Sequence, residues 1–187
     1  GAGLRPMSET LKLAIVTDIH HGPDKLTKVG SAALPKLAEF RTFVGDYQPH
    51  FIAELGDRIS DIDAETDAGQ LLRIADHFTG LPAPHWHLMG NHDQVHLTID
   101  DNARILDQHM AHHSVDVAQR HLVFWQMDCE IHHPQGFIPR QADMDWLAAG
   151  LAAASACVVC RRRCAAEQGP GCILIIGLGY TALARQL

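Results

Sequence analysis

The chain repeats one pattern three times, in which a short apolar run ends in a cluster of polar residues. The apolar runs are residues 11–17, 51–55 and 85–89. The polar clusters that follow them are residues 18–21, 56–58 and 90–93. Short apolar runs bounded by turn residues are typical of strands buried on both faces. The pattern therefore predicts three strands, each of which ends in polar side chains.

Helical periodicity separates these predicted strands. Residues 32–44 carry apolar side chains at helical spacing, despite Pro35 near their start, and residues 66–78 do the same. An alternating order of strand and helix favours a parallel sheet.

The pattern changes beyond the third polar cluster. Residues 100–106 predict a short helix, because their acidic first turn suits the helix dipole. Residues 121–127 predict a strand with aromatic content and partial alternation, and residues 141–154 predict a helix.

Carboxylates, imidazoles and an amide end the first three strands, and the carboxyl ends of parallel strands meet at one edge of a sheet. These side chains are Asp18, His20, Asp57, Asn91 and His92. In a strict strand, Asp18 and His20 would point to the same face, because they are two residues apart, and even a fraying strand end would keep them within reach of one ion. The donor set suits Mn, Fe or Zn, and an aspartate between two ions can bridge them. The set is typical of a two-metal hydrolytic site.

Three motifs in this order resemble the calcineurin-like metallophosphoesterase family. They are Asp18-x-His20, Gly56-Asp57 and Gly90-Asn91-His92-Asp93, and the resemblance covers about residues 11–151. It implies an α/β fold, a layered α/β/β/α sandwich in which a second sheet packs against the first. It also implies two divalent metal ions and phosphoester hydrolysis.

The resemblance assigns the metal ligands. Asp18 and His20 would bind the first metal, Asp57 would bridge both metals, and Asn91 would bind the second. Manganese, iron and zinc remain the alternatives for both positions.

The resemblance also assigns catalytic and substrate-binding residues. His92 would contact the phosphate or protonate the leaving oxygen, and Asn91 would also bind the substrate. Asp93 would orient His92 by accepting a hydrogen bond from its other ring nitrogen. Arg58 has two interpretations, because it could bind a phosphate oxygen or pair with Asp61 on the surface, and we favour the pair.

Four further histidines have two interpretations each. His85 and His87 share one face of the third strand, where they either pack or support the ligands. His132 and His133 lie in a loop after the fourth strand, where they either cap the substrate pocket or are solvated.

The chain departs from the family pattern after the third motif. The family continues with a strand that ends in histidine and with a Gly-His-x-His turn, whereas this chain has no histidine after His133. Residues 155–187 are rich in Ala, Cys and Arg, and we interpret the fold as truncated or altered after about Leu151. Each metal would lose one or two imidazoles, which water, an anion, His132, His133 or a neighbouring chain could replace.

Composition adds few constraints. The chain has 187 residues and 47% hydrophobic content, which predicts one domain over residues 7–154, a cloning remnant at 1–6 and an atypical tail at 155–187. A net charge of −7 gives no basic surface for nucleic acid. The clustering of four of the five cysteines from Cys157 onward predicts neither disulfides nor a metal site. The start has no long apolar run, so we expect a cytoplasmic protein without a membrane partner.

Two functional hypotheses follow. The first is a metal-dependent phosphomonoesterase or phosphodiesterase that acts on a small phosphoester. The second is a catalytically impaired scaffold that binds metal or a partner without turnover. In either case, loss of C-terminal strands would expose a sheet edge, so we expect a homo-oligomer.

Overall fold

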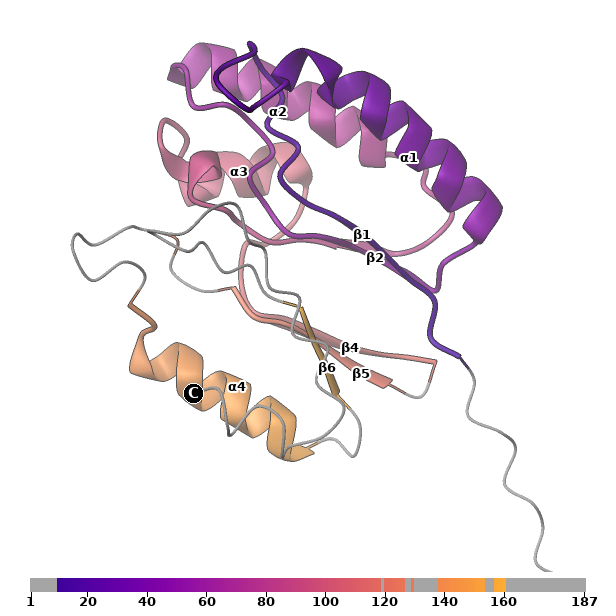
Figure 1. Ribbon diagram of the computed structural model, residues 1–187. Coiled ribbons are helices and arrows are strands. Elements are labelled where there is room, and N and C mark those ends of the chain that lie inside the picture. The colour runs from indigo at the N-terminus through magenta and orange to yellow at the C-terminus, as the bar shows by residue number, and fades with distance from the viewer. Residues whose placement is uncertain (1–9, 119, 127–128, 130–137, 154–156, 161–187) are drawn as a thin grey trace, which may run out of the picture.

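The protein folds into four layers (Figure 1). The structure is a computed structural model that describes residues 10–118, 120–126, 129, 138–153 and 157–160. Two long helices cover one face of the first sheet, the second sheet packs on the other face, and one helix covers the outer face of the second sheet. The predicted α/β/β/α arrangement is confirmed.

The first sheet is parallel and has the strand order β1-β2-β3. Its strands are β1 (Leu13–Val16), β2 (Phe51–Glu54) and β3 (His85–His87). Leu13 pairs with Phe51, and Ile52 pairs with His85. Each strand is shorter than its apolar run, because the backbone leaves the sheet before the polar cluster begins.

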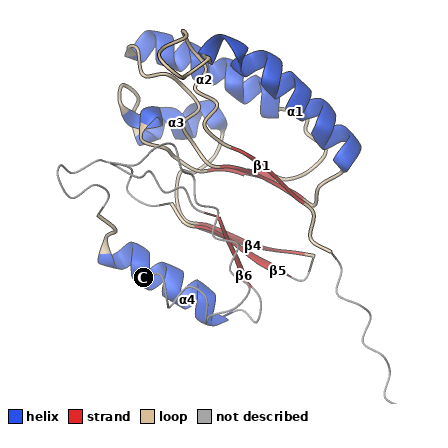
Figure 2. Ribbon diagram, viewed as in Figure 1, coloured by secondary structure: helices blue, strands red, loops and turns tan. Residues whose placement is uncertain are grey.

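Figure 2 shows the helices in blue. Side-chain capping defines where two of them begin. The helices that flank the first sheet are α1 (Ala33–Tyr47), α2 (Ala64–Phe78) and α3 (Ile99–Leu106). Asp63 caps α2 by accepting a hydrogen bond from the Thr66 amide at 2.8 Å. Thr98 and Asp101 form a reciprocal capping box at the start of α3. In the described part of the chain, no helix is long and apolar enough to cross a membrane.

The second sheet combines an antiparallel and a parallel pair. It consists of β4 (His113–Val117), β5 (Arg120–Phe124) and β6 (Cys157–Cys160), and α4 (Gln141–Ala153) packs on it. The strand near residues 121–127 and the helix near 141–154 are confirmed. The sequence does not predict β4 or β6, and β6 extends this sheet with residues that the composition assigns to the tail.

The period-two alternation of strands creates a core on each side of both sheets. Phe51 and Ala53 face the second sheet, whereas Ile52 faces α1 and α2. Phe124 of β5 lies against Phe51, with 5.2 Å between the ring centroids. The next residue, Trp125, faces the other way and packs with Leu147 of α4. Full burial of one such side chain contributes about 1.5–3 kcal/mol. These cores hold the polar ends of β1, β2 and β3 at one edge of the molecule.

Candidate metal centre

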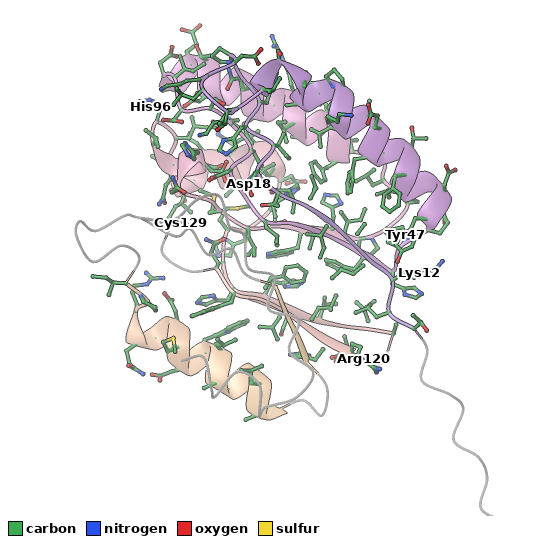
Figure 3. All side chains as sticks on the ribbon, viewed as in Figure 1. Lys12, Asp18, Tyr47, His96, Arg120 and Cys129 are labelled. Atoms are coloured by element: carbon green, nitrogen blue, oxygen red, sulfur yellow. The ribbon has the colours of Figure 1, made fainter. Side chains whose placement is uncertain are left out.

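Backbone hydrogen bonds hold the first two polar clusters side by side beyond the ends of β1 and β2. The amide of Asp18 donates to the Gly56 carbonyl at 3.1 Å, and the amide of His20 donates to the Asp57 carbonyl at 2.9 Å. Figure 3 shows Asp18 at this end of the first sheet and Lys12 at the opposite end. The parallel pairing therefore continues into the candidate site and sets the relative positions of its side chains.

Three of the predicted metal ligands have a left-handed backbone. The φ angles are 54° at Asp18, 47° at His20 and 55° at Asp57. Aspartate and histidine tolerate this region better than most residues, but each instance still costs on the order of 1–3 kcal/mol. The sequence suggested that Asp18 and His20 meet through strand alternation. Because β1 ends at Val16, both residues lie beyond the strand, and alternation does not bring them together. They meet because the chain turns at both residues.

Carboxylate oxygens of Asp18 and Asp57 both lie near the His20 imidazole. His20 Nε2 lies 3.7 Å from Asp18 Oδ1 and 3.7 Å from Asp57 Oδ2, which is too long for a hydrogen bond. Two ligands that each lie about 2.1 Å from one ion are roughly 3–3.5 Å apart, so the spacing is close to that of ligands that share a cation. His20 Nδ1 is buried and has no hydrogen-bond partner among the described residues. Two carboxylates and an imidazole in this arrangement fit a divalent transition metal.

The second and third polar clusters touch through their backbones. Gly56 has a φ of 91°, and a Cβ at this position would lie 2.3 Å from the Gly90 nitrogen and 2.7 Å from the Met89 carbonyl carbon. Both the conformation and the space therefore require glycine. This contact explains why a glycine precedes Asp57.

His92 is held by partners on three sides. Its amide donates to Asp57 Oδ1 at 3.0 Å, and its Nδ1 lies 2.6 Å from Asp61 Oδ1. Its Nε2 lies 3.1 Å from Lys28 Nζ, and its ring meets the His20 ring edge-on at 4.9 Å. A carboxylate only accepts and an ammonium only donates, so we assign the proton to Nδ1 and the lone pair to Nε2. Atoms of His20, Asp57 and His92 lie within 4.8 Å of one another, so His92 also borders the metal position.

Asp93 does not orient His92, contrary to the role that the sequence assigned to it. Its buried carboxylate accepts from the amides of Asp57 at 2.9 Å, Arg58 at 2.7 Å and Gly90 at 2.8 Å. A carboxylate that binds three amides of two loops clamps those loops together. The contact with the His92 imidazole belongs to Asp61, which the sequence considered only as a partner of Arg58.

Arg58 is also part of this buried clamp. Its side chain has 0% exposure, donates to the Leu88 carbonyl, and pairs with Asp93 Oδ2 at 2.8 Å. Its Nε lies 3.3 Å from Glu54 Oε2, as an ion pair without an aligned hydrogen bond. The predicted surface pair with Asp61 is therefore wrong. A phosphate contact would require the guanidinium to leave two buried carboxylates, which is strongly unfavourable.

The two histidines of β3 are packing residues. Their rings contact each other and the Phe78 ring of α2. Burial lowers the pKa of His87 to about 3 and the pKa of His85 to about 4, so both are neutral near pH 7. His87 Nδ1 lies 3.1 Å from Glu54 Oε2, which links it to the buried clamp but not to a metal ligand.

The second sheet holds the third polar cluster from the other side. Gln126, just beyond β5, accepts from the Met89 amide at 2.7 Å, and Cys129 donates through Sγ to the Met89 carbonyl at 3.0 Å. Asn91 follows this segment and precedes a short 3-10 turn, His92–Gln94. Its assignment as a ligand of the second metal stays a prediction. His132 and His133, together with Cys164 and Cys172, lie outside the described residues.

Comparison with known proteins finds similarity in structure but not in sequence. No protein-family model and no curated protein matches the chain. A solved structure of a dimetal phosphatase from Danio rerio matches with a TM-score of 0.69 and 10% sequence identity, over 95% of this chain and 76% of that chain. At this identity the match establishes the fold, and the fold is similar to that of a dimetal phosphatase.

Proposed function

We propose that the protein is a metal-dependent phosphoester hydrolase with a dinuclear centre. The observation that carries this proposal is the position of His20 Nε2, which lies 3.7 Å from Asp18 Oδ1 and 3.7 Å from Asp57 Oδ2. The fold similarity to a dimetal phosphatase supports the same reaction class. In this account, Asp18, His20 and Asp57 would hold the first metal, and Asp57 and Asn91 would hold the second.

The chain's own side chains would do most of the positioning. Bound divalent ions would supply Lewis-acid stabilisation of the phosphoryl oxygens and a water of lowered pKa. Because Nδ1 is held by Asp61, His92 would act through Nε2. A proton gained at Nε2 would let the ring contact a phosphoryl oxygen or protonate the leaving oxygen. Asp93 and Arg58 would hold the loops of Asp57 and His92 in fixed positions relative to each other.

A second candidate function is a metal-binding or partner-binding scaffold without turnover. The observation that favours it is the absence of any histidine after His133. Without further imidazoles, the second position would depend mainly on Asp57 and Asn91. One carboxylate that is shared with the first metal and one neutral amide bind a dication weakly.

Turnover assays with added metal separate these two functions. We expect release of nitrophenol from 4-nitrophenyl phosphate or from its diester, with a rate that saturates as Mn²⁺ is added. The protein should be tested in parallel with Fe²⁺ and Zn²⁺, since all three metals suit the donor set. Failure to hydrolyse either substrate with any of these ions would favour the scaffold.

The proposed binding partner is a small-molecule phosphoester, and neither a membrane nor a nucleic acid is part of the proposal. A cytoplasmic location and a homo-oligomeric state stay predictions. Light scattering at micromolar concentration that shows only a 20.5 kDa species would contradict the oligomer.

A further inference from the structure

Lys28 reaches the candidate site from a loop that the sequence did not connect with it. The side chain is half-buried, and its Nζ lies 3.1 Å from His92 Nε2. A lysine on a surface loop usually extends its ammonium into water. Lys25 of the same loop follows that rule, because it is exposed.

The loop that carries Lys28 is closed at two levels. Asp24 accepts from the Ser31 amide and from the Ser31 hydroxyl, both at 3.0 Å, which joins the two ends of the loop. Lys25 and Lys28 exchange backbone hydrogen bonds at 3.0 Å and 2.9 Å, around a turn in which Leu26 has a φ of 54°. The backbone of Lys28 is therefore fixed by its own loop.

The loop is also packed against the backbone of the candidate metal centre. A Cβ on Gly30 would lie 2.5 Å from the Gly22 carbonyl oxygen and 2.7 Å from the His20 carbonyl oxygen. Only glycine allows this approach. The position of Lys28 relative to His20 is therefore set by backbone contact.

Lys28 is a cation near the candidate metal centre that can bind an anionic ligand. Asp18, Asp57 and Asp61 surround the site with carboxylates, and the guanidinium of Arg58 is held in its buried pair. Among the described residues, no carboxylate forms an ion pair with Lys28, and its Nζ contacts a neutral imidazole. An ammonium gains more from a charged oxygen than from a neutral acceptor, because charge-assisted hydrogen bonds are about twice as strong.

We propose that Lys28 binds the terminal oxygen of a phosphate and makes the site selective for phosphomonoesters over phosphodiesters. The inference rests on the proposed function and names the substrate class. A monoester has three non-bridging oxygens, so one remains charged when two bind metal ions. In a diester the corresponding oxygen is esterified and neutral. Lys28 Nζ, which lies beside His92 Nε2, recognises the oxygen that distinguishes the two classes.

Selectivity is tested with a matched pair of lysine variants. We expect Lys28→Met to lower kcat/KM for 4-nitrophenyl phosphate by roughly 10- to 100-fold, the usual effect of losing a charged hydrogen bond. For methyl 4-nitrophenyl phosphate the loss should be less than about threefold. Lys28→Arg should retain part of the monoester activity, because it keeps the charge. Lys25→Met removes an exposed lysine of the same loop and should change neither rate. An equal loss on both esters would overturn the selectivity.

Binding of inorganic phosphate tests Lys28 without turnover. Titration calorimetry of the full chain with Mn²⁺ should show phosphate affinity at least about tenfold weaker in Lys28→Met than in wild type. Metal content and melting temperature should be unchanged. Unchanged phosphate affinity in Lys28→Met overturns the proposal. If the metal content also rises, the Lys28 ammonium occupies a metal position in the wild type. If the wild type hydrolyses neither ester, the proposed function fails, and the phosphate titration still decides the role of Lys28.

Discussion

Asp93 pairs with Arg58, through Oδ2 and NH1 at 2.8 Å, although its neighbour in the sequence is His92. Both side chains have 0% exposure, and the same carboxylate accepts from the amides of Asp57 and Gly90. Asp61, which is one-third exposed, instead contacts the His92 ring. The two aspartates therefore have separate tasks, because Asp93 holds the loops together and Asp61 orients the histidine.

Removing Arg58 should destabilise the fold. Arg58→Met leaves Asp93 and Glu54 as uncompensated buried charges, which typically costs about 3–5 kcal/mol of unfolding free energy. Urea denaturation followed by circular dichroism measures the change. Arg104→Met is the control, because Arg104 is 70% exposed in its pair with Asp101 and should cost less than about 1 kcal/mol. Equal effects of the two substitutions would contradict the clamp.

Removing Asp61 should affect turnover while the fold stays intact. Asp61→Ala deletes the acceptor of the His92 Nδ1 proton, and loss of such support commonly costs ~10–100-fold in activity. The melting temperature should change little, since Asp61 is partly exposed. Asp116→Ala is the matched control, because Asp116 accepts from His121 at 2.8 Å in the second sheet. Wild-type turnover by Asp61→Ala would show that His92 needs no orienting carboxylate.

Acid should destabilise the protein through His87. Its pKa is 6.5 in the unfolded chain and about 3 in the folded protein, so between these values the unfolded chain binds a proton that the folded protein does not. The contribution of the neutral His87 to the free energy of unfolding is fully present above about pH 6.5. Below that pH the free energy of unfolding falls by about 1.4 kcal/mol per pH unit because of this group. Urea unfolding at pH 7, 6 and 5 gives the free energy of unfolding as a function of pH. Its slope against pH should be smaller for His87→Gln than for wild type. The exposed His109→Gln should keep the wild-type slope, and identical slopes for all three proteins would refute the prediction.

The two metal positions should differ in occupancy. The position of Asp18, His20 and Asp57 has three protein ligands with an imidazole, whereas the position of Asp57 and Asn91 has two. After dialysis against trace metal, elemental analysis should approach one ion per chain, and anomalous scattering should place it beside His20. Two equally filled positions would mean that His132, His133 or a neighbouring chain supplies ligands.

The local part of the fold was predictable because it follows from periodicity. The three strands of the first sheet, the two helices over it and α4 all match their apolar patterns. The sequence did not predict β4. In the structure His113, Val115 and Val117 are partly buried and Ser114 and Asp116 are exposed, but two apolar residues in a five-residue strand are a weak signal in a sequence. The pairing of β6 with β5 depends on contacts distant in sequence, which composition does not encode.

The ligands of the first metal position were predictable for a related reason. Parallel strands bring their carboxyl ends to one edge of the sheet, so the proximity of Asp18, His20 and Asp57 was predictable. The turns at these residues were not predictable, and their role as metal ligands stays a prediction. Lys28 and Asp61 were missed because they reach the site through loop paths that no periodicity describes. Asp93 was misassigned because its carboxylate binds backbone amides, and the sequence pattern carries no information about such partners.

The central claim is tested most directly by Asp57→Asn. The amide oxygen can still accept from the His92 amide, so the loop contact at 3.0 Å is kept while the bridging charge is lost. With saturating Mn²⁺, we predict that release of nitrophenol from 4-nitrophenyl phosphate or its diester, whichever the wild type hydrolyses, is abolished while the melting temperature of the metal-free protein stays near the wild-type value. Unchanged metal-dependent turnover by Asp57→Asn would contradict a hydrolytic centre at this site.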